Sequence, residues 1–351
     1  MPFPRGVNAD LDVFRQQYFQ LLGPETLQWP SAEMLRLPHV QQLIYDEMFN
    51  EHNLQFPPPL RYRMRVLKRL IAKIESSVVD PEEDDISDDL MNALSTLVTA
   101  PFPSEASSAH EKSYVTYHCS EVTQRTQRTV TLLESRAILS SSGSTGLRTW
   151  EAAICLGRYL SSPAGKPCVQ QKNVIELGAG TGYISIICAK HLQSKHVTAT
   201  DGDQGVVEVL ESNAFINGLQ GSSKLTASVL RWGRSLRGSW VEDENANYPF
   251  DIALGADITY DTAAMPALVS TLRDLFAMRP ELVVLISATI RNIDTFGTFK
   301  LACERSRFTV QEIDNSSNET NALTGPFYST AVPIKILKIT QKLHGRDPFA
   351  I

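Results

Sequence analysis

The sequence lacks any run of about 18 consecutive apolar residues, the length that a membrane-spanning helix requires. Its first five residues also lack the apolar core of a secretory signal peptide. Basic residues are few as well, because 33 lysines and arginines against 39 acidic residues give a formal net charge of −6. Proteins that bind nucleic acids broadly usually carry a basic excess. We therefore expect a cytoplasmic monomer that binds neither a membrane nor a nucleic acid directly.

Cysteine is scarce and scattered along the chain. The five cysteines lie at positions 119, 155, 168, 188 and 303, with no C-x-x-C pair and no spacing typical of metal ligands. Several of them fall within apolar stretches, where a free cysteine behaves as a small hydrophobic residue. The pattern predicts free, buried thiols in a reducing compartment and no bound metal.

The length of 351 residues favours two domains. Residues 1–110 have helical spacing of apolar residues and form the first predicted region. Residues 111–142 contain two stretches rich in β-formers, 114–117 and 129–133, which predict a β-hairpin followed by a linker. Residues 143–351 form the second predicted domain, in which strands and helices alternate.

One predicted helix of the first region, Leu60–Glu75, has an apolar stripe and a basic face. The stripe contains Met64, Leu67, Leu70, Ile71 and Ile74, and the opposite face contains Arg61, Arg65, Lys68, Arg69 and Lys73. Such a helix can dock an acidic partner or a membrane surface. It can equally be a solvated face on a helix that packs inward, and the sequence leaves both open.

The segment Asn173–Tyr183 organises the second domain. It predicts a short buried strand, a glycine-rich turn and the start of a helix. Gly178, Gly180 and Gly182 give G-x-G-x-G, one residue short of the fingerprint that binds a dinucleotide pyrophosphate. Glu176 lies just before the turn, where a carboxylate repels phosphate but suits a cation. A ligand with a sulfonium and an ammonium, such as S-adenosylmethionine, fits this pattern; the alternative is a purely structural turn.

Asp201 ends the next predicted strand, which begins at His196. A carboxylate at this position can accept hydrogen bonds from both hydroxyls of a ribose. Alternatively, Asp201 caps the helix that begins near Gln204, and Asp203 offers a second acid for that purpose.

The alternation of strands and helices continues to the end of the chain. Further strands are expected at 225–230, 250–256, 282–288, 308–313 and 332–339, helices at 149–156, 184–192, 206–214, 263–278 and 296–304, and a polar loop at 236–248. Thr149 is the expected N-cap of the first of these helices, with Trp150 either packed in the core or forming a lid over the ligand. The pattern predicts a parallel α/β sheet covered on both faces.

Four motifs in this order resemble those of the seven-strand protein-lysine methyltransferases with a D-x-x-Y motif. They are Glu176-Leu177-Gly178-x-Gly180, Asp201, Leu230-Arg231-Trp232-Gly233 and Asp257-Ile258-Thr259-Tyr260. Residues 143–153 and 289–292, and more loosely the helical stretch 62–75, resemble the eukaryotic elongation factor 2 lysine methyltransferase branch of that family. The resemblance implies a Rossmann-like, mostly parallel sheet of seven strands, S-adenosylmethionine as cofactor and elongation factor 2 as protein substrate.

The resemblance also implies site residues. Gly178, Ala179 and Gly180 would line the amino-acid end of the cofactor and Asp201 its ribose, while the pocket would be closed by Trp150, Trp232 and Ala256. Asp257 would orient the incoming lysine ammonium and Tyr260 would shape the channel; the alternative for Asp257 is a helix cap. Two rival functions are a methyltransferase for another protein or a small molecule, and a cofactor-binding scaffold without catalysis.

Overall fold

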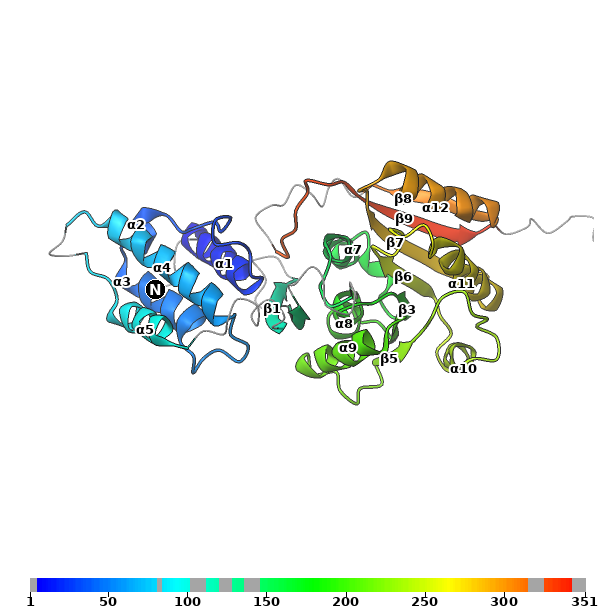
Figure 1. The fold of residues 1–351 in the computed structure, drawn as a ribbon, viewed down its shortest axis with the longest axis horizontal. Coiled ribbons are helices and arrows are strands. Elements are labelled where there is room, and N and C mark those ends of the chain that lie inside the picture. Colours follow the sequence, from blue (N-terminus) through cyan, green and yellow to red (C-terminus); the bar gives the residue numbers. More distant parts are fainter. Residues whose placement is uncertain are drawn as a thin grey trace, which may run out of the picture. The chain divides into compact units, whose positions relative to one another are not determined.

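A computed structural model of the chain describes residues 5–80, 84–101, 112–119, 128–135, 146–314 and 325–342, with side chains from residue 9 onward (Figure 1). Contacts group the chain into two compact units. The first comprises residues 1–138 and 322–327, and the second comprises residues 139–321 and 328–351. The linker that is predicted after the hairpin, up to residue 142, lies outside the described residues.

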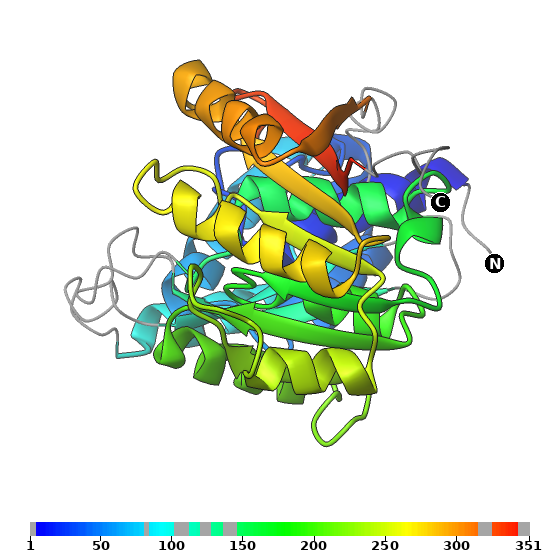
Figure 2. The same ribbon diagram turned by 90° about the vertical axis from the view of Figure 1, so that its right-hand side faces the viewer.

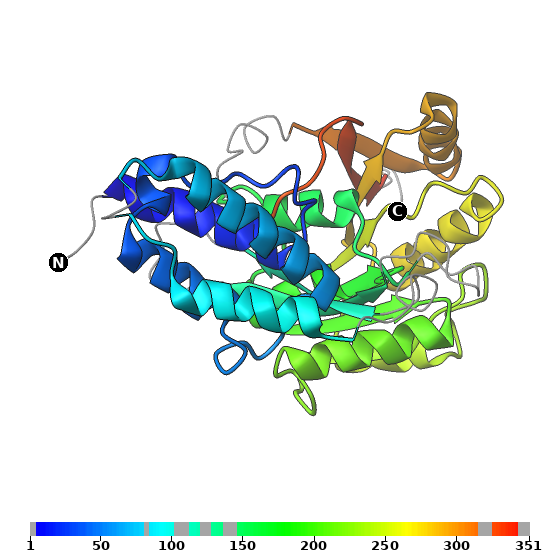
Figure 3. The same ribbon diagram turned by 60° about the vertical axis from the view of Figure 1, so that its left-hand side comes forward.

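The first unit is helical before residue 100. Its elements are α1 (Arg5–Phe19), α2 (Ala32–Leu35), α3 (Pro38–Ile44), the π-helix η1 (Tyr45–Phe49), α4 (Leu60–Ser77) and α5 (Asp88–Thr99), and α4 packs against α5 (Figure 3). Phe14 and Tyr18 of α1 are fully buried in a core that α4 shares. The Tyr18 hydroxyl donates to the Met48 carbonyl oxygen at 2.9 Å, so the one polar atom of this buried ring is satisfied.

The basic helix predicted in this unit is α4. Val66, Leu67, Leu70, Ile71 and Ile74 are buried, whereas Arg65, Lys68, Arg69 and Lys73 are exposed. Arg65 and Arg69 each lie 3.8 Å from Glu25. Ion pairs of this length between exposed side chains add little to stability. The basic face of α4 is thus exposed, as both alternatives require.

The predicted β-hairpin is confirmed. Strand β1 (Lys112–His118) pairs antiparallel with β2 (Thr129–Ser135). The Tyr117 hydroxyl donates to the Glu134 carboxylate at 2.9 Å, and both side chains are buried. The hairpin belongs to the first unit, together with the helices.

The second unit contains one seven-stranded sheet. Its strands are β3 (Asn173–Leu177), β4 (His196–Asp201), β5 (Leu225–Val229), β6 (Ile252–Ala256), β7 (Val283–Thr289), β8 (Phe308–Ile313) and β9 (Ile334–Gln341). Their order is β5-β4-β3-β6-β7-β9-β8, and β9 alone runs antiparallel to its neighbours. The predicted seven-strand, mostly parallel α/β sheet is confirmed. Because β3 pairs with both β4 and β6, the chain reverses its direction of travel across the sheet at β3, where open α/β sheets bind ligands.

Helices cover both faces of this sheet. They are α7 (Glu151–Ser161), the 3₁₀ turn η2 (Lys166–Cys168), α8 (Tyr183–Lys190), α9 (Gln204–Ile216), α10 (Trp240–Asn247), α11 (Met265–Met278) and α12 (Ile293–Arg305). Figure 1 shows α7, α8 and α9 on one face, and Figure 2 shows α10, α11 and α12 on the other. The side chains of β3, β6 and β7 that point to the second face form one apolar core with α11 and α12.

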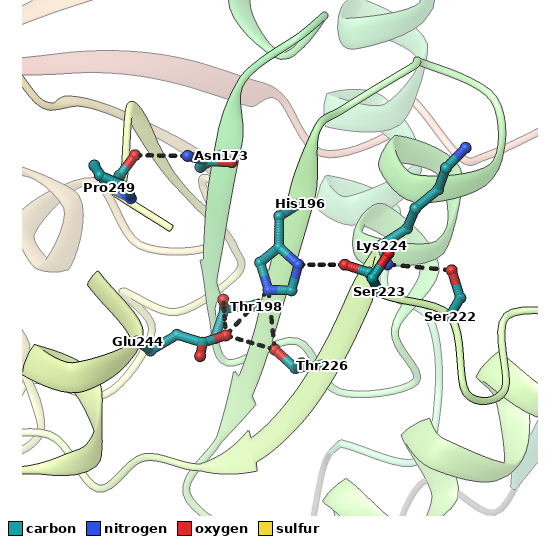
Figure 4. Close-up of polar contacts among 9 residues, drawn as sticks. All are labelled: Asn173, His196, Thr198, Ser222, Ser223, Lys224, Thr226, Glu244 and Pro249. Atoms are coloured by element: carbon teal, nitrogen blue, oxygen red, sulfur yellow. Dashed lines mark hydrogen bonds and ion pairs between the residues drawn. The ribbon is translucent and has the colours of Figure 1, made fainter. Parts of the chain in front are cut away.

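The prediction of a polar loop at 236–248 is wrong, because this segment contains the helix α10. Ser239 caps the helix by accepting from the Val241 amide, and Val241 is fully buried in the core. Glu244 fixes the helix to the sheet: one carboxylate oxygen accepts from Thr198 at 3.1 Å and from Thr226 at 3.0 Å, and lies 3.0 Å from Nε2 of His196 (Figure 4). Helix α10 is thus held to the sheet by polar contacts of Glu244 and lacks the apolar stripe by which a helix is recognised in a sequence.

The prediction that Thr149 is the N-cap of α7 is also wrong. Trp150 is the N-cap residue, and its side chain makes no capping hydrogen bond. The Thr149 hydroxyl is instead 2.7 Å from the Thr181 hydroxyl, so it ties the start of α7 to the glycine-rich turn. All five cysteines are free; those at 155, 188 and 303 are buried, and those at 119 and 168 are half-buried.

Two further absences apply to the described ranges only. None of their helices is both long and apolar enough to cross a membrane. Within the same ranges no group of three histidine, cysteine or acidic side chains could hold a metal ion.

Candidate functional site

The carboxyl ends of the parallel strands surround a cavity of about 640 Å³ in the second unit. This volume lies within the usual range of small-molecule sites, roughly 300–1,000 Å³. The cavity is lined by every site residue that the sequence predicted: Trp150, Glu176, Gly178, Ala179, Gly180, Asp201, Trp232, Ala256, Asp257 and Tyr260. Residues separated by more than 100 positions therefore meet at one edge of the sheet, because the strands that carry them are parallel.

The glycine-rich turn forms the floor of the cavity. Gly178 and Gly180 have φ values of +67° and +55°, a region that other residues avoid. A Cβ atom on Gly178 would lie 2.8 Å from Ile258 Cγ2, so a side chain does not fit there. The backbone of the turn is thus exposed to a ligand, and the Ala179 amide holds the turn in place by donating to the Thr200 carbonyl oxygen at 2.8 Å.

Glu176 lies at the end of β3 and is 98 % buried, since only 2 % of it is exposed. Ser185 of α8 donates its hydroxyl to the carboxylate. Burial raises the pKa of Glu176 to about 8, and the charge of Asp201 adds to the increase. A cation in the cavity would oppose this shift, so the site favours a positively charged ligand beside Glu176.

The helix-capping alternative for Asp201 is wrong, because Asp203 has that role. Asp203 caps α9, because its carboxylate accepts from the amides of Gly205 and Val206 at 2.7 and 3.2 Å. Asp201 instead accepts from the Gly180 amide at 3.1 Å and lines the cavity. Burial raises the pKa of Asp201, partly offset by its backbone hydrogen bonds.

Asp257 follows β6 with a φ of +49°, an unusual conformation for aspartate that turns its side chain toward the end of β7. One carboxylate oxygen accepts from the Thr289 amide at 2.7 Å, and the other accepts from the Thr289 hydroxyl at 2.9 Å. Helix α11 begins eight residues later, at Met265, behind Ala264 as N-cap. The capping alternative for Asp257 is therefore wrong.

Burial raises the pKa of Asp257, and three influences oppose it: the two hydrogen bonds from Thr289 and the nearby Arg291 guanidinium. Arg291 Nη2 lies 3.6 Å from the carboxylate. The result is a buried carboxylate that is aligned by its neighbours and faces the cavity, as orientation of a cationic group requires.

The outer part of the cavity is aromatic and cationic. Trp150 is half-buried, and the guanidinium carbons of Arg148 and Arg291 lie 5.1 and 5.2 Å from the centre of its ring. Tyr260 is 60 % exposed, so it belongs to the mouth rather than to the floor. Arg148, Arg231 and Ile258 also line the cavity, and the sequence did not single out their roles. Arg231 and Ile258 stand inside the quoted motifs, and Arg148 lies within the stretch 143–153.

The polar groups that line the cavity determine which kind of ligand it can bind. Three buried or mostly buried carboxyl groups, Glu176, Asp201 and Asp257, face a floor of exposed backbone. They repel phosphate and accept hydrogen bonds from hydroxyl and ammonium groups. The site therefore suits a cationic ligand with hydroxyl groups, together with a second cation at Asp257.

Comparison with known proteins identifies the relatives of this chain. A family described as lysine methyltransferase matches residues 134–301. A protein-lysine N-methyltransferase, EFM3 of Chaetomium thermophilum, is 45 % identical over 95 % of this chain and 98 % of its own length. The human protein-lysine N-methyltransferase EEF2KMT is 29 % identical over 84 % of this chain and 87 % of its own.

Solved structures with a similar fold are more distant. Precorrin-6y C5,15-methyltransferase from Geobacter metallireducens is 11 % identical, covers 60 % of this chain and 94 % of its own, and superposes with a TM-score of 0.38.

Proposed function

Because this chain belongs to the lysine methyltransferase family, we propose that it transfers the methyl group of S-adenosylmethionine to a lysine side chain of elongation factor 2. Transfer to a protein lysine is the activity in the name of its 45 % identical relative. The observation that carries the proposal is one cavity with Glu176 and Asp201 on the side of the glycine-rich turn and Asp257 at the neighbouring strand end.

The residues present fit S-adenosylmethionine. The exposed backbone of Gly178, Ala179 and Gly180 would contact its amino-acid end, and Asp201 would accept from the ribose hydroxyls. Glu176 is the carboxylate that suits the positive charges of this ligand. Trp150, Trp232 and Ala256 would close the pocket around it. Glu176 and Asp201 disfavour a phosphate at this side of the cavity, because like charges repel.

The cofactor supplies a methyl group activated by a positively charged sulfur. The protein has to present an amine in line with that methyl group and to keep water out, so positioning contributes more than acid–base chemistry. A free lysine titrates near about 10.4 and must lose a proton before its nitrogen can attack. Asp257 would orient the lysine through its ammonium, and Tyr260 would shape the channel through which the side chain enters.

The choice of elongation factor 2 is supported by the motifs at 143–153 and 289–292, which resemble the elongation factor 2 branch. We assign the recognition of the protein substrate to the helical region 1–110, which lies outside the predicted methyltransferase domain 143–351. A cytoplasmic location accords with this substrate, because translation factors work there.

Isotopically labelled S-adenosylmethionine and purified elongation factor 2 test the proposal, with mass spectrometry to locate the label. We expect label on one lysine with the wild-type chain and none with Asp257→Ala. Label on another protein of a lysate, with none on the factor, would keep the enzyme and replace the substrate. Measurable binding of the cofactor without label on any protein would favour a scaffold.

A further inference from the structure

The segment Thr289–Asn292 follows β7 and lies against the end of β6. Thr289 donates twice to Asp257, and Asn292 caps α12 by accepting from the amides of Asp294 and Thr295 at 2.8 and 3.1 Å. The first and last residues thus fix the segment at both ends. Arg291 lies between them and its side chain lines the cavity.

Arg291 contacts two other residues of the site. Its guanidinium nitrogen Nη2 is 3.6 Å from Asp257 Oδ2, and its guanidinium carbon is 5.2 Å from the centre of the Trp150 ring. The Arg291 side chain is 49 % exposed, whereas that of Asp257 is 7 % exposed. A half-exposed cation therefore lies at the outer side of a buried anion.

The number of lone pairs on the Asp257 carboxylate limits how many cationic groups it can bind at once. A carboxylate offers about four lone-pair sites, two on each oxygen. Thr289 uses one site on each oxygen, and Arg291 lies beside Oδ2. Two sites therefore remain, one on each oxygen, and an ammonium group that bonds to the remaining Oδ2 site meets Arg291 there.

We propose that Arg291 is a positioning residue that holds the Asp257 carboxylate in place and competes for it with the lysine ammonium of the substrate. The lysine displaces Arg291 as it enters, and the guanidinium stays on the Trp150 ring. This inference rests on the role of Asp257 in the proposed function, and it adds a residue that sets how tightly the substrate lysine binds.

The strengths of these contacts permit the exchange. A long ion pair with one exposed partner stabilises by little, because solvent screens it. The contact with Trp150 is of comparable strength and persists after the ion pair breaks. The lysine, by contrast, would reach Asp257 inside the cavity, where less water screens the charges and the interaction is stronger.

Three variants test the competition by steady-state kinetics with a protein substrate that the wild type methylates. Arg291→Gln removes the charge, Arg291→Lys retains it, and Arg237→Gln removes an exposed arginine that is not among the residues lining the cavity. For Arg291→Gln we expect KM for the protein substrate to fall by up to about fivefold, the limit for an exposed pair, with kcat within about twofold. Arg291→Lys and Arg237→Gln should keep KM within about twofold. A rise in KM for Arg291→Gln, or no change, would overturn the proposal.

A second measurement does not need turnover. The ¹³C signal of the Asp257 carboxyl group, assigned by its loss in Asp257→Asn, reports the pKa of this group. That pKa should be higher in Arg291→Gln than in the wild type, and Arg237→Gln should leave it unchanged. An unchanged pKa in Arg291→Gln would contradict the ion pair itself. If the wild type methylated no protein, the proposed function would fail, while this titration would still decide the contact between Arg291 and Asp257.

Discussion

The strands of the second unit's sheet carry polar side chains near both of their ends, and these side chains have different roles. We call the side where the parallel strands begin the amino edge and the side where they end the carboxyl edge. At the amino edge, His196, Thr198 and Thr226 surround Glu244, and Nδ1 of His196 lies 2.7 Å from the Ser223 carbonyl oxygen (Figure 4). The His196 ring also stacks on Tyr248 at 3.7 Å. These contacts hold α10 to the sheet.

The carboxyl edge has the opposite character. Glu176, Asp201 and Asp257 all have raised pKa values because burial disfavours their charged forms, and all three line the cavity. Two turns at this edge have backbone with positive φ, at Gly178 and at Asp257. Incompletely compensated carboxyl groups are typical of a binding site, whereas mutually satisfied polar groups are typical of a structural role.

The largest expected effect comes from breaking the carboxyl edge at Asp257. Asp257→Asn keeps the shape but removes the charge that would orient the lysine, and a misplaced nucleophile costs on the order of 100-fold in rate. We therefore expect kcat to fall by about this factor while the Kd of the cofactor stays the same. Initial rates and calorimetry measure the two quantities, and full turnover in the variant would remove Asp257 from the mechanism.

The next effect comes from breaking the amino edge at Glu244. Glu244→Ala leaves the buried His196 and Thr198 and the half-buried Thr226 without their shared acceptor, and each unsatisfied buried group costs about 1–3 kcal/mol. Because these losses overlap, we expect the free energy of unfolding in urea to fall by about 2 kcal/mol in total. Asp243→Ala, on the exposed side of the same helix, is the control and should change it by less than about 0.5 kcal/mol. Equal losses in both variants would mean that the cluster does not anchor α10.

The third effect is a pH dependence of stability at Glu176. Its pKa is about 8 in the folded protein against a usual value of 4.5, so the folded state holds a proton that the unfolded state has lost. Without cofactor, the free energy of unfolding should therefore rise as the pH falls from about 8 toward 4.5. Asp201 and Asp257 act in the same direction, because burial raises their pKa values also.

Glu176→Gln sharpens this measurement by removing the titration. Urea unfolding between pH 6 and pH 8.5 should show a flatter dependence in the variant than in the wild type. The same slope in both proteins would assign the pH dependence to other groups.

The sequence predicted the residues of the carboxyl edge better than the segment at the amino edge. Glu176, Asp201 and Asp257 each stand at the end of an apolar strand, and parallel strands bring their ends together whatever lies between them. The role of α10 was missed because Val241 is its one buried apolar side chain and its anchor is polar. A helix that is held by polar contacts with distant strands need not show the helical periodicity of apolar residues in its own sequence.

Two other contacts could not be predicted because they join residues that are far apart in the sequence. Thr149 was expected to cap α7, but its hydroxyl lies beside Thr181 in the folded chain. The contact of Arg291 with Asp257 joins the ends of two adjacent strands. The sequence motif at 289–292 identified the segment, and the three-dimensional structure was needed to show which carboxylate its arginine meets.

The difference between the two edges is tested most directly by calorimetric titration of S-adenosylmethionine into the wild type, Asp201→Ala and Glu244→Ala, at a temperature where all three are folded. Loss of hydrogen bonds to a charged group costs about 1.5–3 kcal/mol, so Kd should rise by roughly 10- to 100-fold in Asp201→Ala. Kd should stay within about twofold in Glu244→Ala, because its contacts lie at the other edge. Equal weakening in both variants, or unchanged binding in Asp201→Ala, would contradict the assignment of the carboxyl edge as the cofactor site.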